Sequence, residues 1–310
     1  MMFPGKFAEQ LIADKLDKVS LSFLVDVLEI RRGGVGANIA FGMGRLGLRP
    51  LLAAAVGADF AEYRAWLEAH GVDTSGVRES PLYHTARFVC TTDADGNQIA
   101  SFYPGAMAEA RDIDICALAR EAGGLDLVLI GADDPEAMLR HTAGCAAAGI
   151  PFAADPSQQL ARMGGEQVRA LVEGAAYLFG NEYEVALAER KTGWTAAEIM
   201  DRVGVRVTTL GAAGARVDRA GEPPLLVPPV PVSQVADPTG AGDAFRAGFL
   251  AAVAWGLPLE RAAQLGNLIA AGVLETVGTQ EYDLKPELLA ERFGAVYGEA
   301  AAEEISACLA

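Results

Sequence analysis

The sequence predicts an α/β protein in which helices flank a mostly parallel, doubly wound sheet, with a second and smaller β piece. Two observations predict this class, and a third indicates a globular chain. From about residue 125 onward, short apolar runs alternate with helical patterns, as strands and helices do in a parallel sheet. Between residues 85 and 103, two short runs instead enclose turn residues, as in a hairpin. Of the 310 residues, 51% are hydrophobic and 21% are charged, which is typical of a globular chain.

The first third of the chain predicts both strands and helices. An apolar run with β-branched residues at 21–30, which two glycines end, predicts a strand. Apolar residues at helical spacing predict helices at 38–48 and 59–69, separated by a buried strand at 51–56. Inside the first helix, Gly42-Met43-Gly44-Arg45-Leu46-Gly47 matches the dinucleotide-binding fingerprint, but that fingerprint needs a strand immediately before its first glycine. This context argues against an NAD-dependent dehydrogenase.

The runs at 85–92 and 98–103 predict two strands joined by Asp93-Ala94-Asp95-Gly96-Asn97. If this loop is centred on Asp95, antiparallel pairing puts Phe88 directly opposite Phe102. The two rings then share one face of the hairpin.

The remaining elements follow in alternation. Strands are predicted at 127–130, 150–154, 177–179, 205–210, 215–218 and 225–227, of which the last two form a short hairpin. Helices are predicted at 135–148, 166–171, 182–191, 241–255, 259–274 and 285–297.

Composition argues against several classes of function. The net charge of −16 argues against a nucleic acid or an anionic membrane as a partner. Only three histidines are present, which argues against a zinc site, and no apolar run reaches membrane-spanning length. The first ten residues lack the apolar core of a signal peptide. The four cysteines show no CxxC spacing, which predicts reduced thiols in a cytoplasmic protein.

The chain is organised around residues 236–245, with the sequence Ala-Asp-Pro-Thr-Gly-Ala-Gly-Asp-Ala-Phe. Gly240, Ala241 and Gly242 directly precede a helical pattern, so they fall at a helix N-terminus, where free N–H groups and the helix dipole favour an anion. Asp243 then stands in the first turn, where it can take a proton from an attacking hydroxyl during phosphoryl transfer. The alternative is an ordinary glycine-rich helix start with an acidic first turn.

This run resembles the second signature of the ribokinase-like (PfkB) sugar and nucleoside kinases. Gly33-Gly34-Val35-Gly36-Ala37-Asn38, which continues to Arg45-Leu46-Gly47, resembles their first signature. The two motifs stand in the family's order, which makes a chance match of either one less credible. The resemblance extends over nearly the whole chain, and within the family it is nearest to the bacterial adenosine kinases.

The resemblance implies a ribokinase-like fold in two parts. A kinase core is expected at 34–81 and 107–310, and a small β-sheet lid at 1–33 and 82–106. The lid would cover the acceptor. In adenosine kinases of bacterial type such a lid can also clasp a second subunit, which implies a homodimer.

By the same resemblance, Asp243 is the catalytic base, and the N–H groups of Gly240, Ala241 and Gly242 form the anion hole. The implied ATP-binding residues are Asn181, Thr209, Gly211, Gly214 and Asn267, the last of these near the adenine. Turn chemistry or an ordinary polar group of a helix is the alternative for the last four of these positions.

The resemblance also implies where cations bind. Asn181 and Glu184 resemble the family's N-x-x-E motif and would hold Mg²⁺ through water. Their spacing alone favours a simpler alternative, an asparagine helix cap with glutamate at the third helical position. Asp237 lies where family members often bind a monovalent cation such as K⁺, and its alternative is a turn residue before proline.

The implied acceptor-binding residues are Gly34, Asn38, Phe88, Phe102, Gln158 and Gln159. The glycine and the asparagine resemble the family's contacts to sugar hydroxyls. The glutamines follow a parallel strand at its carboxyl end, where α/β proteins bind ligands, and resemble substrate contacts of bacterial adenosine kinases. The two phenylalanines would offer π faces to a flat base, with a place in the core as the alternative.

The predicted function is ATP-dependent phosphoryl transfer to the 5′-hydroxyl of a nucleoside, with adenosine converted to AMP in purine salvage. One alternative is a sugar kinase with a ribose- or fructose-type acceptor, and another is a binding homologue with weak catalysis. The second alternative arises because family members begin with a strand followed by an aspartate that binds two acceptor hydroxyls. Met1-Met2-Phe3-Pro4-Gly5 matches the segment after that strand, so this aspartate has no counterpart, and we expect weaker nucleoside binding and lower stability.

Overall fold

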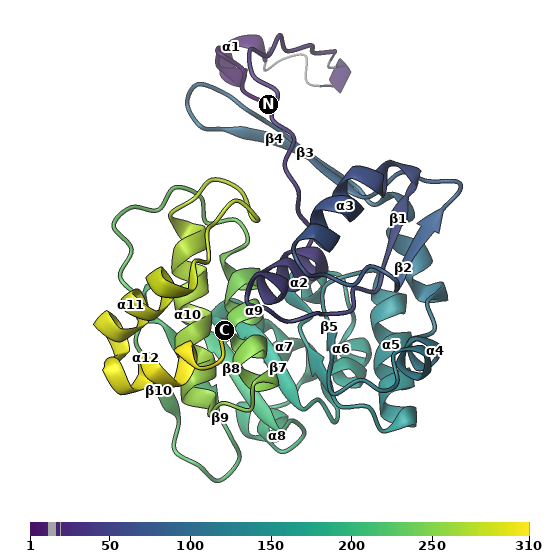
Figure 1. The fold of residues 1–310 in the computed structure, drawn as a ribbon. Coiled ribbons are helices and arrows are strands. Elements are labelled where there is room, and N and C mark those ends of the chain that lie inside the picture. The colour runs from purple at the N-terminus through teal and green to yellow at the C-terminus, as the bar shows by residue number, and fades with distance from the viewer. Residues whose placement is uncertain (12–16, 19, 310) are drawn as a thin grey trace.

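A six-stranded sheet lies at the centre of the protein, and its strands follow the order β10-β9-β8-β7-β6-β5 (Figure 1). The computed structural model describes residues 1–11, 17–18 and 20–309. Strands β5 to β8 are parallel, whereas β9 is antiparallel to β8 and β10 is antiparallel to β9. The strands are β5 Val128–Ile130, β6 Phe152–Ala154, β7 Tyr177–Asn181, β8 Val205–Thr209, β9 Ala215–Asp218 and β10 Leu225–Val227. The predicted mostly parallel sheet is therefore confirmed.

Helices cover both faces of this sheet. Successive residues of a strand point to opposite faces, so each strand contributes side chains to two apolar cores. Phe152 and Leu178 pack into one apolar core, and Ala153 and Phe179 pack into the other. The first core contains α4 Ile115–Glu121, α5 Pro135–Ala148, α6 Gly165–Val172, α7 Glu182–Thr192 and α8 Ala196–Met200. The second contains α2 Val35–Arg45, α3 Ala61–Ala69, α9 Ala241–Ala254, α10 Leu259–Leu274, α11 Pro286–Tyr297 and α12 Glu299–Ser306. This double coverage confirms the doubly wound arrangement.

Two smaller β pairs stand apart from the central sheet. Strands β1 (Ala54–Gly57) and β2 (Val77–Ser80) form a parallel pair. Strands β3 (Arg87–Thr92) and β4 (Gln98–Tyr103) form an antiparallel hairpin in which Phe88 pairs with Phe102. The predicted register of the hairpin is therefore confirmed.

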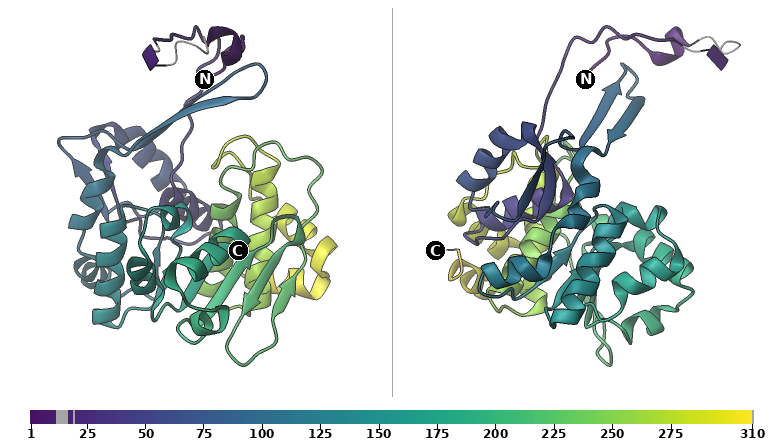
Figure 2. Two further views of the ribbon diagram at one scale, coloured as in Figure 1. Left: turned by 180° about the vertical axis from the view of Figure 1, so that it is seen from behind. Right: turned by 90° about the vertical axis from the view of Figure 1, so that its right-hand side faces the viewer.

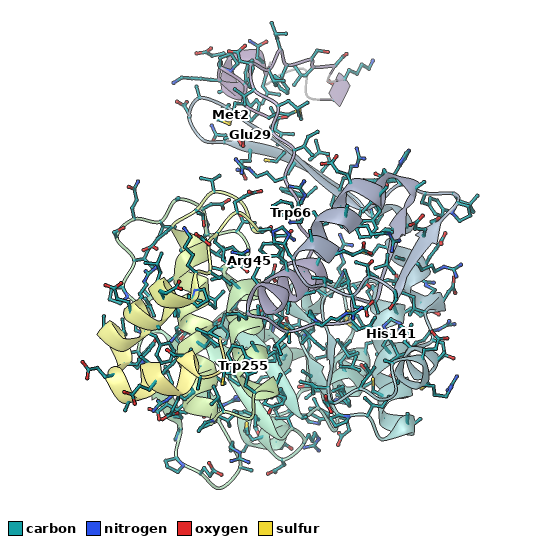
Figure 3. The ribbon with its side chains drawn as sticks, viewed as in Figure 1. Met2, Glu29, Arg45, Trp66, His141 and Trp255 are labelled. Atoms are coloured by element: carbon teal, nitrogen blue, oxygen red, sulfur yellow. The ribbon has the colours of Figure 1, made fainter. Side chains whose placement is uncertain are left out.

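The N-terminal residues attach to this hairpin, and the two together project from the body of the molecule (Figure 2). The Phe3 N–H donates to the Thr92 carbonyl at 2.8 Å. The rings of Phe3, Phe7 and Phe23 cluster with centroids 4.9 to 5.8 Å apart, and Phe7 begins the short helix α1 (Phe7–Gln10). Met2 lies in this projecting part, whereas His141 lies in the body (Figure 3).

The prediction of a strand at 21–30 is wrong. The structure has only an isolated bridge there, between Val27 and Met2. Leu24 and Ile30 are 83% and 89% exposed, so the apolar run is not the inside of a sheet. Apolar and β-branched residues favour a strand only where a neighbouring strand supplies hydrogen bonds along its length, and this segment has two such bonds, both to Met2.

The other predicted elements form, with bounds that differ by a few residues at most. The helices α5 and α10 and the strands β9 and β10 have the predicted bounds. Within the described chain, no helix is both long and apolar enough to cross a membrane. All four cysteines are unpaired, namely Cys90, Cys116, Cys145 and Cys308.

Candidate active site

The start of α9 leaves backbone N–H groups free. Gly240 caps the helix with a φ of +81°, and a Cβ there would lie 2.8 Å from the Thr279 side chain, so both the backbone and its neighbour require glycine. In the described chain, the N–H groups of Gly240, Gly242 and Asp243 make no hydrogen bond. The N–H of Ala241 makes only a long bond of 3.4 Å. Free N–H groups at a helix N-terminus attract anions, and the helix dipole adds to this attraction.

The carboxylate of Asp243 lies in the first turn of the same helix. Burial raises its pKa to about 6, against the opposing effects of a hydrogen bond from Asn38 and the charge of Arg246. The Asn38 Nδ2 donates to Asp243 Oδ2 at 2.7 Å. A carboxylate with this pKa is ionised at neutral pH and takes up a proton readily, as a general base must.

The amide of Asn38 is held in one orientation. Asn38 is 5% exposed and belongs to α2, which packs along α9. Its Oδ1 accepts from the Thr279 hydroxyl and from the Gln280 amide, each at 3.0 Å. Gln280 in turn accepts from the indole N–H of Trp66, which is labelled on α3 in Figure 3. Because Oδ1 is occupied by two donors, the NH₂ group of Asn38 must face Asp243.

A buried ion pair joins α9 to the loop that follows β6. Arg246 lies one helical turn after Asp243, and its guanidinium holds the Asp155 carboxylate with two bonds, Nε to Oδ2 at 2.5 Å and Nη2 to Oδ1 at 2.7 Å. A third bond runs from Arg246 Nη1 to the Gly242 carbonyl at 3.1 Å. The pair therefore connects the start of α9 to the loop that carries Gln158 and Gln159.

Most of the residues predicted for ATP meet at the carboxyl ends of β7 and β8. Asn181 ends β7 and pairs in register with Thr209, which ends β8. The following turn contains Gly211, with a φ of +56°, and Gly214, with a φ of +91°. A Cβ on Gly214 would lie 2.1 Å from the carbonyl oxygen of Val227, so only glycine fits there.

Asn181 and Glu184 form the helix cap that their spacing also predicts. Asn181 Oδ1 accepts from the Glu184 N–H at 2.9 Å, and Glu184 Oε2 accepts from the Asn181 N–H at 2.8 Å. Carboxylate and amide oxygens are ligands that Mg²⁺ uses, and this ion keeps several of its waters. In the part of the chain that the structure describes, no three His, Cys, Asp or Glu side chains gather as a metal cluster. The amide and carboxylate of this pair are therefore groups that suit Mg²⁺ bound through water.

The side chains of Asn267 and Asp237 each make hydrogen bonds to backbone groups. Asn267 is buried in α10, and its Nδ2 donates to the Pro228 carbonyl at 2.9 Å. Asp237 accepts from the N–H groups of Thr239 and Gly278 at 2.9 and 3.2 Å. Burial acts to raise the pKa of Asp237, yet these hydrogen bonds hold it below its ordinary value. Asp237 is therefore a stable negative charge beside the start of α9.

The residues predicted for the acceptor fall into exposed and buried groups. Gly34 caps α2 with a φ of +103° and has open space on its Cβ side. Phe88 and Phe102 are 68% and 50% exposed, so the alternative of two core phenylalanines is wrong. Gln158 is exposed, whereas Gln159 is 7% exposed, and its Oε1 has no hydrogen-bond partner among the described residues.

Sequence reasoning missed the residues that hold Asn38 and Asp243 in place. Arg246 carried a signal, because it is a single cation within an apolar helical stretch, three residues after Asp243. Gln280 carried none, because it lies 242 residues from Asn38 along the chain.

The chain is similar to known proteins along most of its length. The family model for the pfkB family of carbohydrate kinases matches residues 5–286. A nucleoside kinase from Methanocaldococcus jannaschii is 31% identical over 80% of this chain and 80% of its own length. A ribokinase from Bacillus subtilis is 28% identical over 86% of this chain and 89% of its own length.

Solved structures give the same result for the fold. The nucleoside kinase from Burkholderia thailandensis in complex with inosine has a TM-score of 0.83 and 34% identity, covering 96% of this chain and 94% of that one. Its structure in complex with ADP-inosine has a TM-score of 0.81 and 35% identity, covering 96% and 92%. Since the family model spans most of the chain and the fold is ribokinase-like, this protein belongs to the pfkB family of carbohydrate kinases and is a kinase.

Proposed function

We propose that the protein transfers the γ-phosphoryl group of ATP to the 5′-hydroxyl of a nucleoside. The observation that carries this proposal is the meeting of Asp243, with its pKa of about 6, and the free N–H groups at the start of α9. Such a site supplies a base and a place for developing negative charge, both of which phosphoryl transfer requires of a protein. The nucleoside kinases among the relatives support a nucleoside as the acceptor.

In this reaction Asp243 accepts the proton of the 5′-hydroxyl while that oxygen forms its bond to the γ-phosphorus. The bond from the γ-phosphorus to the bridging oxygen breaks, and ADP leaves with the electron pair. The N–H groups of Gly240, Ala241 and Gly242 stabilise the charge on the transferred group. Asn38 keeps the carboxylate in position through its bond of 2.7 Å.

ATP would occupy the edge formed by the ends of β7 and β8. The residues that we assign to it are Asn181, Thr209, Gly211, Gly214 and Asn267. Asn181 and Glu184 would hold Mg²⁺ through water, and the ion would supply positive charge that offsets the negative charge of the phosphates. The ionised carboxylate of Asp237 would hold a monovalent cation such as K⁺.

The acceptor would bind between the start of α2 and the hairpin. Gly34 lets the ribose approach the backbone, and Asn38 stands behind it. Phe88 and Phe102 present two exposed rings, directly opposite each other, to the base. The unsatisfied Oε1 of Gln159 is an acceptor that an N–H group of a purine would satisfy, which removes the cost of a buried polar atom without a partner.

We further propose adenosine as the preferred acceptor, with AMP as the product of a purine-salvage reaction. An assay of ADP release with adenosine, inosine, guanosine, cytidine, ribose and fructose tests this proposal. The highest kcat/KM is expected for adenosine, with the sugars at least tenfold lower. Activity on inosine above that on adenosine would keep the nucleoside kinase and reject adenosine as its preferred acceptor.

A sugar kinase is the second candidate, because the ribokinase from Bacillus subtilis aligns with most of this chain. In the same assay, the kcat/KM for a ribose- or fructose-type sugar would then exceed that for every nucleoside. Nucleoside binding without ADP release would instead indicate a binding homologue with weak catalysis.

We also propose that the lid, residues 1–33 and 82–106, closes on the acceptor and joins two copies of the chain, while residues 34–81 and 107–310 form the kinase core. The hairpin register places Val89, Ile99 and Tyr103 on the face opposite Phe88 and Phe102. These three side chains are 43 to 45% exposed. One apolar face is thus available for the base and the other for a second copy. The four unpaired cysteines support a cytoplasmic setting for this enzyme.

A further inference from the structure

The ion pair between Arg246 and Asp155 is the most deeply buried pair of charges near the site. The two residues are 4% and 0% exposed. Replacing such a pair with apolar residues of similar volume is often neutral or stabilising, so burial of the charges does not by itself explain the pair. The contacts of the two side chains indicate its role.

Each partner holds a different part of the proposed site. Arg246 donates to the carbonyl of Gly242, whose N–H belongs to the anion hole. Asp155 Oδ1 accepts from the Ser157 hydroxyl at 3.0 Å. Ser157 is the one non-glycine residue with a positive φ, +42°, in the described chain. This left-handed conformation is costly for a serine, and it begins the turn that carries Gln158 and Gln159.

The pair also acts on Asp243 through its charges. The charge of Arg246 favours the ionised form of Asp243, and the charge of Asp155 opposes it. The charge of Asp243 also acts on Tyr63 and Tyr282, whose pKa values burial raises, so that both remain neutral. The negative charge of Glu184, which lies on α7, acts to raise the pKa of Arg246.

We propose that Arg246 and Asp155 are positioning residues, a single buried clamp that fixes the anion-hole helix relative to the loop that holds the nucleoside. The inference rests on the proposed function, because it assigns Gly242 and Asp243 to phosphoryl transfer and the loop to the acceptor. A second consequence is that the clamp tunes the proton affinity of Asp243.

The chain offers a matched control in a second buried Arg–Asp pair. Arg206 donates to Asp218 Oδ2 at 3.2 and 3.3 Å, and the two residues are 8% and 6% exposed. This pair joins β8 to β9 near the start of β8, whereas Thr209 and the proposed ATP edge lie at the other end of that strand. It is likewise a buried Arg–Asp pair, although Asp218 also accepts from Arg216 Nε at 2.8 Å, and it makes no contact with the proposed site.

The experiment compares Arg246→Lys, Asp155→Asn, the double variant Arg246→Gln/Asp155→Asn and the control Asp218→Asn. For each, we would measure the melting temperature, kcat and KM across the nucleoside and sugar panel, and the titration of the Asp243 carboxyl by ¹³C NMR without substrates. The Asp243 signal is identified by its loss in Asp243→Asn. The Lys variant keeps the charge but loses the two-point geometry, so kcat is expected to fall on the order of 10²-fold, the effect of about 1 Å of misplacement.

The titration gives opposite expectations for two variants. In Asp155→Asn the charge of Arg246 acts uncompensated, so the pKa of Asp243 should fall below about 6, its value in the unaltered protein. In the double variant both charges are gone, so this pKa should rise again relative to Asp155→Asn. The control should lower the melting temperature while kcat, KM and the titration stay unchanged.

A purely structural role would give a different result. Asp155→Asn and Asp218→Asn would then lower the melting temperature alike, and all the clamp variants would keep the kcat of the unaltered protein, which overturns the proposal. An unchanged Asp243 titration would overturn the second consequence, that the clamp tunes the proton affinity of Asp243. If Asp155→Asn alone does not fold, the Lys and double variants decide between the two roles. If no nucleoside is phosphorylated by the unaltered protein, the proposed function fails, while the substrate-free titration still tests the clamp.

Discussion

The start of α9 and the proposed lid differ in how far hydrogen bonds and packing within the chain complete them. Around Asp243, the side chains of Asn38, Arg246 and Gln280 are buried and hydrogen-bonded to one another or to neighbouring elements. In the lid, Phe88 and Ile30 are 68% and 89% exposed. The side chains at the start of α9 are therefore already packed and hydrogen-bonded without a ligand, whereas the proposed lid leaves apolar side chains exposed.

This difference separates the two tasks of the proposed enzyme. A base and an anion hole work best when fixed in advance, because reorganisation during the reaction then costs little. A recognition surface gains when it is buried by its ligand, and fully burying a phenylalanine side chain is worth roughly 1.5–3 kcal/mol. Substitutions at α9 should therefore act on turnover, and substitutions in the lid should act on binding.

The largest effect is expected for Asp243→Asn, which removes the proton acceptor and keeps the shape. Loss of a general base typically lowers kcat by about 10² to 10⁴-fold. Binding of ADP, measured by calorimetry, should stay close to that of the unaltered protein. A kcat within a factor of two of the original would remove Asp243 from the role of base.

The same variant should be more stable at pH 8 than the unaltered protein. The folded pKa of Asp243, about 6, lies above its ordinary value of 3.8, so its favourable contribution is fully present below about pH 4 and is lost as the pH rises through 6. At neutral pH the buried ionised carboxylate then costs roughly 1–3 kcal/mol, which asparagine avoids. Melting temperatures at pH 4 and pH 8 should show the gain only at the higher pH.

The next effect is expected for Phe102→Ala, which tests the lid side of the comparison. Loss of a base-stacking ring is worth roughly 1–3 kcal/mol, so KM for the nucleoside should rise about 5- to 150-fold, while KM for ATP stays nearly constant. Phe102 is 50% exposed, so little stability should be lost. Leu288→Ala, at a 57% exposed apolar position on α11, is the control and should change neither KM. Equal weakening of both substrates with a lower melting temperature would show that Phe102 serves the fold.

The two regions were also unequally predictable from sequence. The register that pairs Phe88 with Phe102 followed from a local loop centred on Asp95, and the structure has it. The prediction of a strand from the apolar run at 21–30 failed, because strand formation depends on a distant partner that local composition does not reveal. The helix α8 was missed although Thr195 and Glu198 form a capping box, because five residues are too few for a periodic pattern.

Within the site, the motif around Asp243 could be recognised from the sequence because its residues are contiguous. The support for Asn38 was not, because Thr279 and Gln280 approach it from a loop more than 240 residues away along the chain. Hydrogen bonds between such segments leave no periodicity or spacing in the sequence. The buried clamp was partly predictable. Arg246 stood out as a cation within an apolar helix, but nothing in the sequence identified Asp155 as its partner.

A smaller effect is expected from pH, again on the α9 side. Only ionised Asp243 can accept a proton, so kcat/KM should fall about tenfold for each pH unit below about 6 and level off above it. Burial also raises the pKa of Asp133, after β5, to about 6, which makes Asp133→Asn the matched control. This variant should keep the acid limb of the profile. If the limb disappears in Asp133→Asn, then Asp133 is the group that titrates, and Asp243 does not set the pH dependence.

The smallest effect on turnover is expected from the outer face of the hairpin. Ile99 is 45% exposed, on the face opposite Phe88, and a lysine there would put a charge into the proposed contact between two copies. Sedimentation velocity should show a dimer for the unaltered protein and a monomer for Ile99→Lys. The control Leu288→Lys, on α11, should remain dimeric. Because the α9 site is complete within one chain, kcat should change less than twofold in the monomer, and only KM for the nucleoside should rise if the second copy steadies the lid. A monomeric unaltered protein would reject the dimer, and a large loss of kcat in Ile99→Lys would show that the two regions are not separable.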